Sequence, residues 1–175
     1  MKTILEYIST QTKPSTIKAT DETIHQIIRD EFERLGPEAD LNHIDVSKVT
    51  FMKGLFDAQE GNTLTIPPHL KLTVTANSRD TSSFNGYRRF EIFNGDISKW
   101  NVSKVKDMCC MFHRCKSFNC DISNWDVSNV MDLAYMFDGC TDFNQDLSNW
   151  NINLNARVGT AMFRDCGIQN SYRPK

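Results

Sequence analysis

Residues 118–137 read FNCDISNWDVSNVMDLAYMF, and the same pattern occurs 25 residues earlier and 25 residues later. The earlier copy reads FNGDISKWNVSKVKDMCCMF, and the later copy begins FNQDLSNWNI. Residues that recur at this spacing include Trp100, Trp125 and Trp150; Phe93, Phe118 and Phe143; Asp96, Asp121 and Asp146; and Ser98, Ser123 and Ser148. A fixed period of roughly 20 to 30 residues is typical of a solenoid, in which each repeat forms one coil.

The register slips once, because Met111 and Met136 are followed by Met162 rather than by a methionine at 161. This slip predicts one inserted residue near Arg157–Val158. A degenerate earlier copy, LNHIDVSKVTFMKGLF at residues 41–56, predicts a first coil with a damaged outer strand. No coil can bury its apolar face alone, so neighbouring coils must stack.

Within each coil, the pattern predicts a short strand over DISNWDV, followed by a helix or tight turn over SNVMDLAYMF. Apolar residues of the second segment fall at i, i+3, i+6 and i+7, which indicates one helical face. Ser128 is a suitable N-cap for such a helix. Stacked strands would form a short parallel sheet with a spacing of about 4.8 Å.

The motif F-N-x-D-I-S-x-W-D-V-S-x-V-x-x-M-x-x-M-F-x-x-C resembles the repeat of the BspA-like leucine-rich-repeat surface proteins. The resemblance is strong over residues 93–166 and weaker over residues 41–56, and it also extends to GPEADLNHIDVS after the first helix. It implies an α/β, leucine-rich-repeat-like solenoid that binds macromolecules. It implies no enzyme activity and no catalytic residues.

The flanking segments predict caps for the two ends of the solenoid. TDETIHQIIRDEFERL, residues 20–35, predicts an amphipathic helix with Thr20 as N-cap, Asp21 and Glu22 in its first turn, and Gly36-Pro37 as its stop. Its apolar face is expected to comprise Ile24, Ile27, Ile28, Phe32 and Leu35. A further short helix is expected at residues 2–9, and Ile168 and Tyr172 are expected to cover the last coil.

The spacing of the phenylalanines predicts one insertion, at about residues 58–90. Phe112 and Phe118 are 6 residues apart, whereas Phe56 and Phe93 are 37 apart. Leu70, Leu72 and Val74 alternate with polar residues there, which indicates a β-rich segment. The expected organisation is a helical cap over residues 1–40 and a solenoid over 41–175, with regular repeats at 93–166 and a C-terminal cap at 167–175.

The composition and net charge of the chain argue against some classes of protein. Charged residues are 24%, hydrophobic residues 39%, and the formal net charge is −2. This balance argues against a polybasic nucleic-acid binder. No apolar run reaches the roughly 18 residues of a membrane helix, and the start is not a secretory signal. A cytoplasmic location with six reduced cysteines is therefore expected.

Two clusters suggest metal chemistry, but each has a structural explanation that we favour. Cys109, Cys110, Cys115 and Cys120 lie within 12 residues, yet Cys115, Cys140 and Cys166 share one repeat position and should form a buried column. Cys120 is expected at an exposed, oxidisable loop tip. Asp96, Asp121 and Asp146 could bind a cation, but a side chain that recurs in every coil suits turn formation better. Asn94, Asn119 and Asn144 predict a similar hydrogen-bonding column.

The four histidines, His25, His43, His69 and His113, lie in unrelated segments, and no phosphate-binding glycine loop occurs. We therefore expect a non-enzymatic protein-binding module without a cofactor or metal, more specifically a phage or mobile-element inhibitor of a host defence protein. The alternatives are a bacterial surface adhesin and a metal-dependent enzyme. Expected partner-binding residues come from the insertion and from variable repeat positions: Phe84, Tyr87, Arg88, Arg89, Lys99, Lys104, His113 and Arg114.

Overall fold

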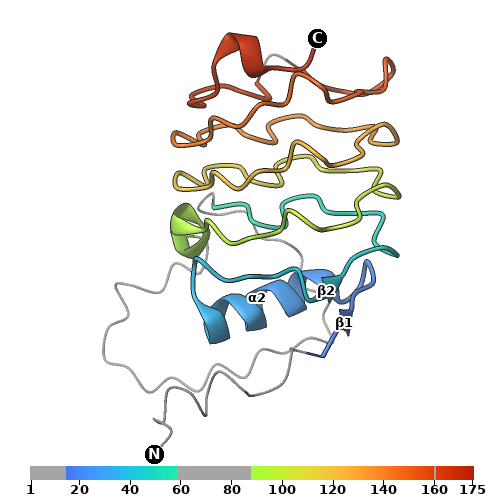
Figure 1. Cartoon of the computed structure of the whole chain (residues 1–175), viewed down its shortest axis with the longest axis vertical. Coiled ribbons are helices and arrows are strands. Elements are labelled where there is room, and N and C mark those ends of the chain that lie inside the picture. The colour runs from blue at the N-terminus through green and yellow to red at the C-terminus, as the bar shows by residue number, and fades with distance from the viewer. Residues whose placement is uncertain (1–14, 59–87, 160) are drawn as a thin grey trace, which may run out of the picture.

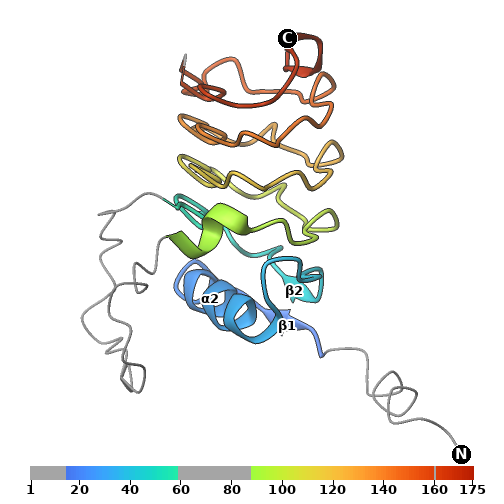
Figure 2. The same ribbon diagram turned by 90° about the vertical axis from the view of Figure 1, so that its left-hand side faces the viewer.

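The computed structural model describes residues 15–58, 88–159 and 161–175. In these residues the chain winds in successive turns that stack along the long axis of the molecule (Figures 1 and 2). Helix α2 (Ile24–Leu35) lies at one end of the stack, and the C-terminus lies at the other (Figure 1). Strands β1 (Ile17–Lys18) and β2 (Ile44–Asp45) form a two-stranded parallel sheet beside α2. Two 3₁₀ helices, η1 (Arg88–Ile92) and η2 (Asn170–Tyr172), complete the regular elements.

Each coil is built from consecutive β-turns. In the coil that starts at Asp96, i+3 amides donate to carbonyls from Trp100 to Ile97 (3.1 Å), from Val105 to Val102 (2.9 Å) and from Met111 to Met108 (3.1 Å). The first and last residues of each turn are buried. The helix that was one alternative for residues 128–137 is therefore absent, and tight turns take its place. A β-turn also directs residues i and i+3 inward, so a chain of turns produces the apolar spacing that we interpreted as a helical face.

Asx turns precede these β-turns, as predicted for the recurring aspartates. The carboxylates of Asp96, Asp121 and Asp146 accept the amides of Ser98, Ser123 and Ser148 at 2.9, 3.0 and 2.9 Å. Ser128, the expected helix N-cap, instead donates its amide and its hydroxyl to Asp126. The aspartates and serines of the motif thus form turns, because short polar side chains satisfy the backbone where it reverses.

The core contains ordered columns of aromatic rings. One column comprises Phe56, Phe112, Phe137 and Phe163, with centroid distances of 5.4, 5.7 and 5.5 Å. A second column comprises Phe93, Phe118 and Phe143, spaced at 5.9 and 5.6 Å. Rings of the two columns also stack on one another, as Phe112 and Phe118 do at 4.0 Å. Each coil therefore completes the hydrophobic layer of its neighbours.

Hydrogen bonds along the stack hold the coils in register. Asn94 accepts the amide of Asn119 at 2.8 Å, Asn119 accepts that of Asn144 at 3.0 Å, and Asn144 accepts that of Gln169 at 3.0 Å. The predicted asparagine column is thus confirmed. The slip in register is confirmed as well: Leu133 donates to Arg157, 24 residues ahead, whereas Phe137 donates to Met162, 25 ahead. The extra residue therefore lies between Arg157 and Met162.

Most of the parallel bridges between coils lie at a different place from the one that we expected. In the described residues one bridge, from Asp40 to Asp96, lies at the first residue of an expected strand segment. The other three join Phe51 to Asp107, Asp107 to Asp132, and Asp132 to Arg157. These three bridges follow the second turn of each coil, whereas the rest of the expected strand over DISNWDV folds as turns. The bridges are isolated, because each coil turns away again after one or two residues. The leucine-rich-repeat-like class stays a prediction.

The cap helix begins four residues later than predicted, at Ile24. Asp21 and Glu22 therefore precede its first turn, and Asp21 instead accepts the amides of Thr50 (at 2.6 Å) and Phe51 (at 3.0 Å). Thr20 accepts the amide of Ile24 through its backbone carbonyl and is not the N-cap. The helix ends before Gly36, as predicted.

The buried face of α2 covers the first coil. Ile24, Ile28 and Phe32 are buried, and the ring of Phe32 packs edge-on against Phe90 at 5.0 Å. Leu35, expected on this face, is 43% exposed. At the other end Ile168 is buried and Tyr172 packs against the core, as expected. The helix expected at residues 2–9 and the strand expected at Leu70–Val74 lie outside the described residues.

Candidate functional site

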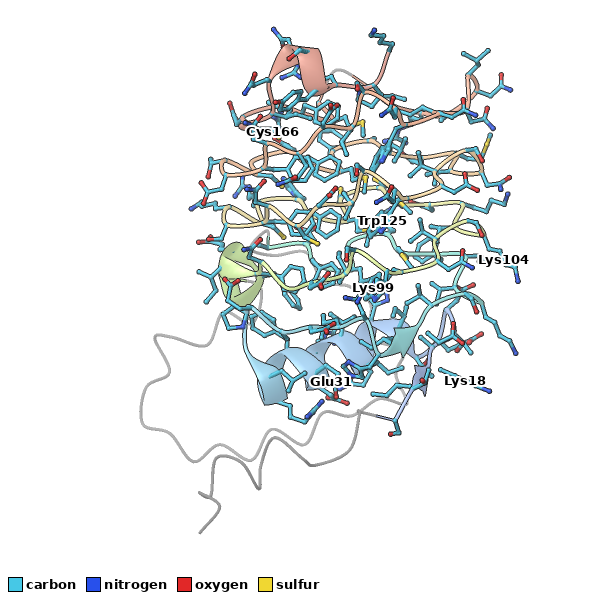
Figure 3. The ribbon with its side chains drawn as sticks, viewed as in Figure 1. Lys18, Glu31, Lys99, Lys104, Trp125 and Cys166 are labelled. Carbon is cyan, nitrogen blue, oxygen red and sulfur yellow. The ribbon has the colours of Figure 1, made fainter. Side chains whose placement is uncertain are left out.

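One set of exposed positions of the coils is the third residue of the β-turns. Lys99, Asn124 and Asn149 occupy the third position of equivalent turns and are all exposed. Lys104 and Asn129 do so in the next turn. Lys99 and Lys104 belong to the same coil but lie in different parts of it (Figure 3). The stack therefore presents two columns whose chemistry changes from lysine to asparagine after the first of these coils, while the turn stays the same.

A further variable column lies beside the parallel bridges, and sequence analysis missed it. Lys106 and Met131 share one repeat position, and the amide of Met131 donates to the carbonyl of Lys106 at 2.8 Å. Both are exposed, and Phe51, which forms the first of these bridges, is 42% exposed. The change from lysine to methionine at one repeat position was the available signal. Apolar and cationic side chains thus share this face.

The expected partner-binding residues differ in their exposure in the structure. Lys99, Lys104 and Arg114 are exposed. Arg88 and Arg89 lie in η1, but their side chains, like all of Phe84 and Tyr87, fall outside the described residues. His113 is buried, so its assignment as a surface contact is wrong.

His113 belongs to a column of ionisable side chains along the stack, which we call the charged column and of which only Arg164 is exposed. The residue that follows the core phenylalanine of each coil is Asp57, His113, Asp138 or Arg164. His113 Nδ1 lies 3.2 Å from Asp57 Oδ1, and its Nε2 lies 3.4 Å from Asp138 Oδ2. Arg164 donates its Nε to Asp138 Oδ1 at 3.0 Å and also pairs with the other carboxylate oxygen. The buried carboxylates of Asp57 and Asp138 therefore each have a partner from the next coil, as buried polar groups require.

The thiol of Cys110 joins the lower part of this column. Ligand atoms of Asp57, Cys110 and His113 all lie within 4.8 Å of one another. Burial and the neighbouring thiol of Cys109 raise the pKa of Cys110 to about 12. Sequence analysis missed this cluster, because Asp57 and His113 are 56 residues apart across the insertion.

The predicted column of cysteines is present, but its members differ in how deeply they are buried. Cys115 and Cys140 are buried and donate their thiols to Phe56 and Phe112 carbonyls at 2.8 and 2.9 Å, while Cys166 is half-buried. Burial raises the pKa of Cys120, which is half-buried rather than exposed at a tip. A raised pKa lowers the thiolate population, so the expectation of ready oxidation is not supported.

Comparison with known protein families identifies the family of this chain. A family model described as Mycoplasma protein of unknown function, DUF285, matches residues 74–172, which is more than half of the chain. The chain belongs to this family. No curated protein and no solved structure matches it. In the described residues, no helix is long and apolar enough to cross a membrane.

Proposed function

We propose that this chain is a non-enzymatic protein-binding module whose recognition surface is formed by the variable turn positions of its coils. The single observation that carries the proposal is the contrast between the buried and the exposed residues of equivalent turns. Buried positions repeat in kind, as Trp100, Trp125 and Trp150 do. Exposed positions change from cation to amide or from cation to thioether. A constant frame with a variable surface is how stacked-repeat proteins obtain specificity.

Three further observations support this function. The resemblance to the BspA-like repeat proteins implies macromolecular binding. Lysines and apolar side chains share the face around Phe51, Lys106 and Met131, a mixture that suits a protein partner. All six cysteines are free thiols, which supports action in a reducing compartment such as the interior of a cell.

The test uses substitutions that the frame already accepts. Lys99→Asn, Lys104→Asn and Lys106→Met each introduce the residue found at the same repeat position one coil later. An affinity pull-down from lysate of the native host, with the wild type as bait, should enrich one protein. The triple coil variant should lose it, while its thermal unfolding midpoint stays close to that of the wild type.

The matched comparison is the triple variant Tyr87→Ala, Arg88→Ala, Arg89→Ala. If only this variant loses the partner, the insertion carries recognition and the coil surface does not. If the wild type enriches no protein, the proposed function is wrong.

A further inference from the structure

We propose that Asp57, Cys110 and His113 form a binding site for a divalent transition-metal ion, with Zn²⁺ as the best match. The three side chains come from adjacent coils and offer one carboxylate oxygen, one sulfur and one imidazole nitrogen. Asp57 and His113 are buried and Cys110 is half-buried, so the site lies at the edge of the core and leaves the thiol partly accessible. This proposal is independent of the protein-binding function.

The distances suit tetrahedral coordination. Bonds of about 2.0 Å to oxygen and nitrogen and about 2.3 Å to sulfur place tetrahedral ligand atoms roughly 3.3 to 3.6 Å apart. Asp57 Oδ1 and His113 Nδ1 are already 3.2 Å apart. The sulfur lies within 4.8 Å of both, so it needs to move by roughly 1 to 1.5 Å at most to reach bonding distance.

The donor set selects the class of metal. Thiolate and imidazole are ligands of zinc and related transition metals, whereas Ca²⁺ and Mg²⁺ prefer oxygen donors alone. Three protein ligands leave the fourth tetrahedral position to water or to an incoming group.

The surroundings of His113 provide the outer support that metal-binding histidines require. A ligating imidazole usually donates its second N–H to a carboxylate, which fixes the tautomer and the ring orientation. His113 Nε2 lies 3.4 Å from Asp138, and Arg164 holds that carboxylate with its Nε at 3.0 Å. This arrangement directs Nδ1 toward Asp57 and Cys110, where the ion would lie.

The ligand set occurs once, unlike the turn-forming residues. At the turn position of Cys110 the other coils carry Gly54, Tyr135 and Ala161, which offer no comparable donor beside their charged column. No second group of three His, Cys, Asp or Glu ligands gathers in this way in residues 15–58, 88–159 and 161–175. The charged column explains why His113 lies between two carboxylates, but it does not require a thiol. The left-handed backbone at Cys110 is shared with Tyr135 and so belongs to the frame rather than to the site.

The experiment adds Zn²⁺ or Co²⁺ alone to the purified full chain after treatment with a chelator. We expect one ion per chain by mass spectrometric metal analysis, a higher thermal unfolding midpoint with Zn²⁺, and a thiolate-to-cobalt charge-transfer band with Co²⁺. Cys110→Gly should abolish the band and weaken Zn²⁺ binding more than tenfold. This variant should still fold, because Gly54 occupies the equivalent turn position with φ +62°.

Three controls make the result specific. Tyr135→Gly introduces the same change one coil later and should leave Zn²⁺ binding unchanged. Cys109→Ala removes the adjacent thiol, whose sulfur lies 3.6 Å from that of Cys110, and should retain the cobalt band. Asp138→Asn should weaken Zn²⁺ binding by about 10- to 100-fold without changing the ligand set.

Equal binding of Zn²⁺ by the wild type and by Cys110→Gly would overturn the proposal, because the ion would then lie elsewhere. Loss of the band in Cys109→Ala with retention in Cys110→Gly would overturn the assignment of the ligand. No binding by the wild type would leave the cluster as a structural ion-pair column and would also overturn the proposal.

Discussion

At the scale of single residues, the turns force several side chains into a conformation that suits glycine. Cys110, Arg114, Tyr135 and Asp165 have φ between 51° and 60°. Gly54 occupies the position equivalent to Cys110, with φ 62°, and Gly139 occupies the position equivalent to Arg114, with φ 78°. A left-handed backbone costs a non-glycine residue about 1 to 2 kcal/mol. The chain therefore stores strain at turn positions where the frame does not need a side chain.

Arg114→Gly should stabilise the protein. Relief of the left-handed strain exceeds the entropy that glycine adds to the unfolded chain, which is about 0.5 to 1 kcal/mol, so the expected net gain is also about 0.5 to 1 kcal/mol. Urea unfolding followed by tryptophan fluorescence measures it. The reverse change, Gly139→Ala, should destabilise, since the new Cβ would lie 3.2 Å from Arg114 Cγ. A loss of stability in Arg114→Gly would contradict the explanation.

The three tryptophans should respond differently to replacement by phenylalanine. Trp100 and Trp150 donate their indole N–H to Leu41 and Ile122 carbonyls at 3.0 and 3.2 Å. The buried N–H of Trp125 has no hydrogen-bond partner in the described part of the chain. Trp100→Phe should therefore cost about 1 kcal/mol more than Trp125→Phe in free energy of unfolding. Equal costs would show that the indole hydrogen bond at Trp100 contributes nothing.

At the scale of elements, the sequence identified the residues of each coil better than its backbone. The buried residues, the Asx turns and the asparagine column follow from recurrence, because only structural positions must repeat. The backbone was ambiguous, because β-turns and helices both place residues i and i+3 on one side. The start of α2 was missed for a tertiary reason: Asp21 binds the backbone of Thr50 and Phe51 and so is not available to the helix.

The contact of Asp21 with the first coil should depend on pH. Burial raises the pKa of Asp21, but the hydrogen bonds from Thr50 and Phe51 outweigh burial and lower it overall. A lowered pKa means that the carboxylate stabilises the fold above about pH 4 and that this contribution is lost as the pH falls through the lowered value. Asp21→Asn should therefore be less stable than the wild type near pH 7, and the difference should shrink on acidification.

Thermal unfolding between pH 7 and pH 2 measures this difference. Asp30→Asn is the matched control, because it removes the same charge from the exposed side of α2, where Asp30 accepts the side-chain amide of Gln26 at 2.6 Å. A constant difference between wild type and Asp21→Asn over the whole range would show that charge plays no part in the contact.

At the scale of the whole molecule, stability depends on the position of a residue along the stack. Phe118 stacks on Phe93, Phe112 and Phe143. In the described residues, the one aromatic ring stacked on Phe163 is that of Phe137, and Phe163 is only partly buried. In a stack, each unit gains stability only from its neighbours. Interior coils therefore pack between two coils, whereas the last coil packs against one coil and the short C-terminal segment that holds Ile168 and Tyr172.

Phe118→Ala should cost about 3 to 5 kcal/mol, as expected for a fully buried phenylalanine. Phe163→Ala should cost clearly less, because the terminal ring leaves a cavity that is open to relaxation. Denaturant unfolding of both variants provides the comparison. If the two costs were equal, the molecule would behave as one uniform core rather than as a stack.

The candidate metal cluster shows where sequence analysis reaches its limit. Cys110 and His113 are close in sequence, and their spacing alone is unremarkable. Asp57 reaches them only because residues 56 positions apart occupy adjacent coils. The insertion disguises this relation, since the regular spacing of 25 would place His113's neighbour at residue 88. Recurrence in the sequence identifies the residues that build every coil. A set of ligands that occurs once can be recognised only when the positions of its side chains in space are known.

The asparagine column has a genetic consequence. Asn94, Asn119 and Asn144 join successive coils through the same atoms, so both faces of a coil carry the same donors and acceptors. After an in-frame duplication or deletion of residues 118–142, the coils on either side could still form the same hydrogen bonds with their new neighbours. A gene of this kind can lengthen or shorten its product by whole coils in one recombination event, and natural variants that differ in coil number are the expected trace of that process.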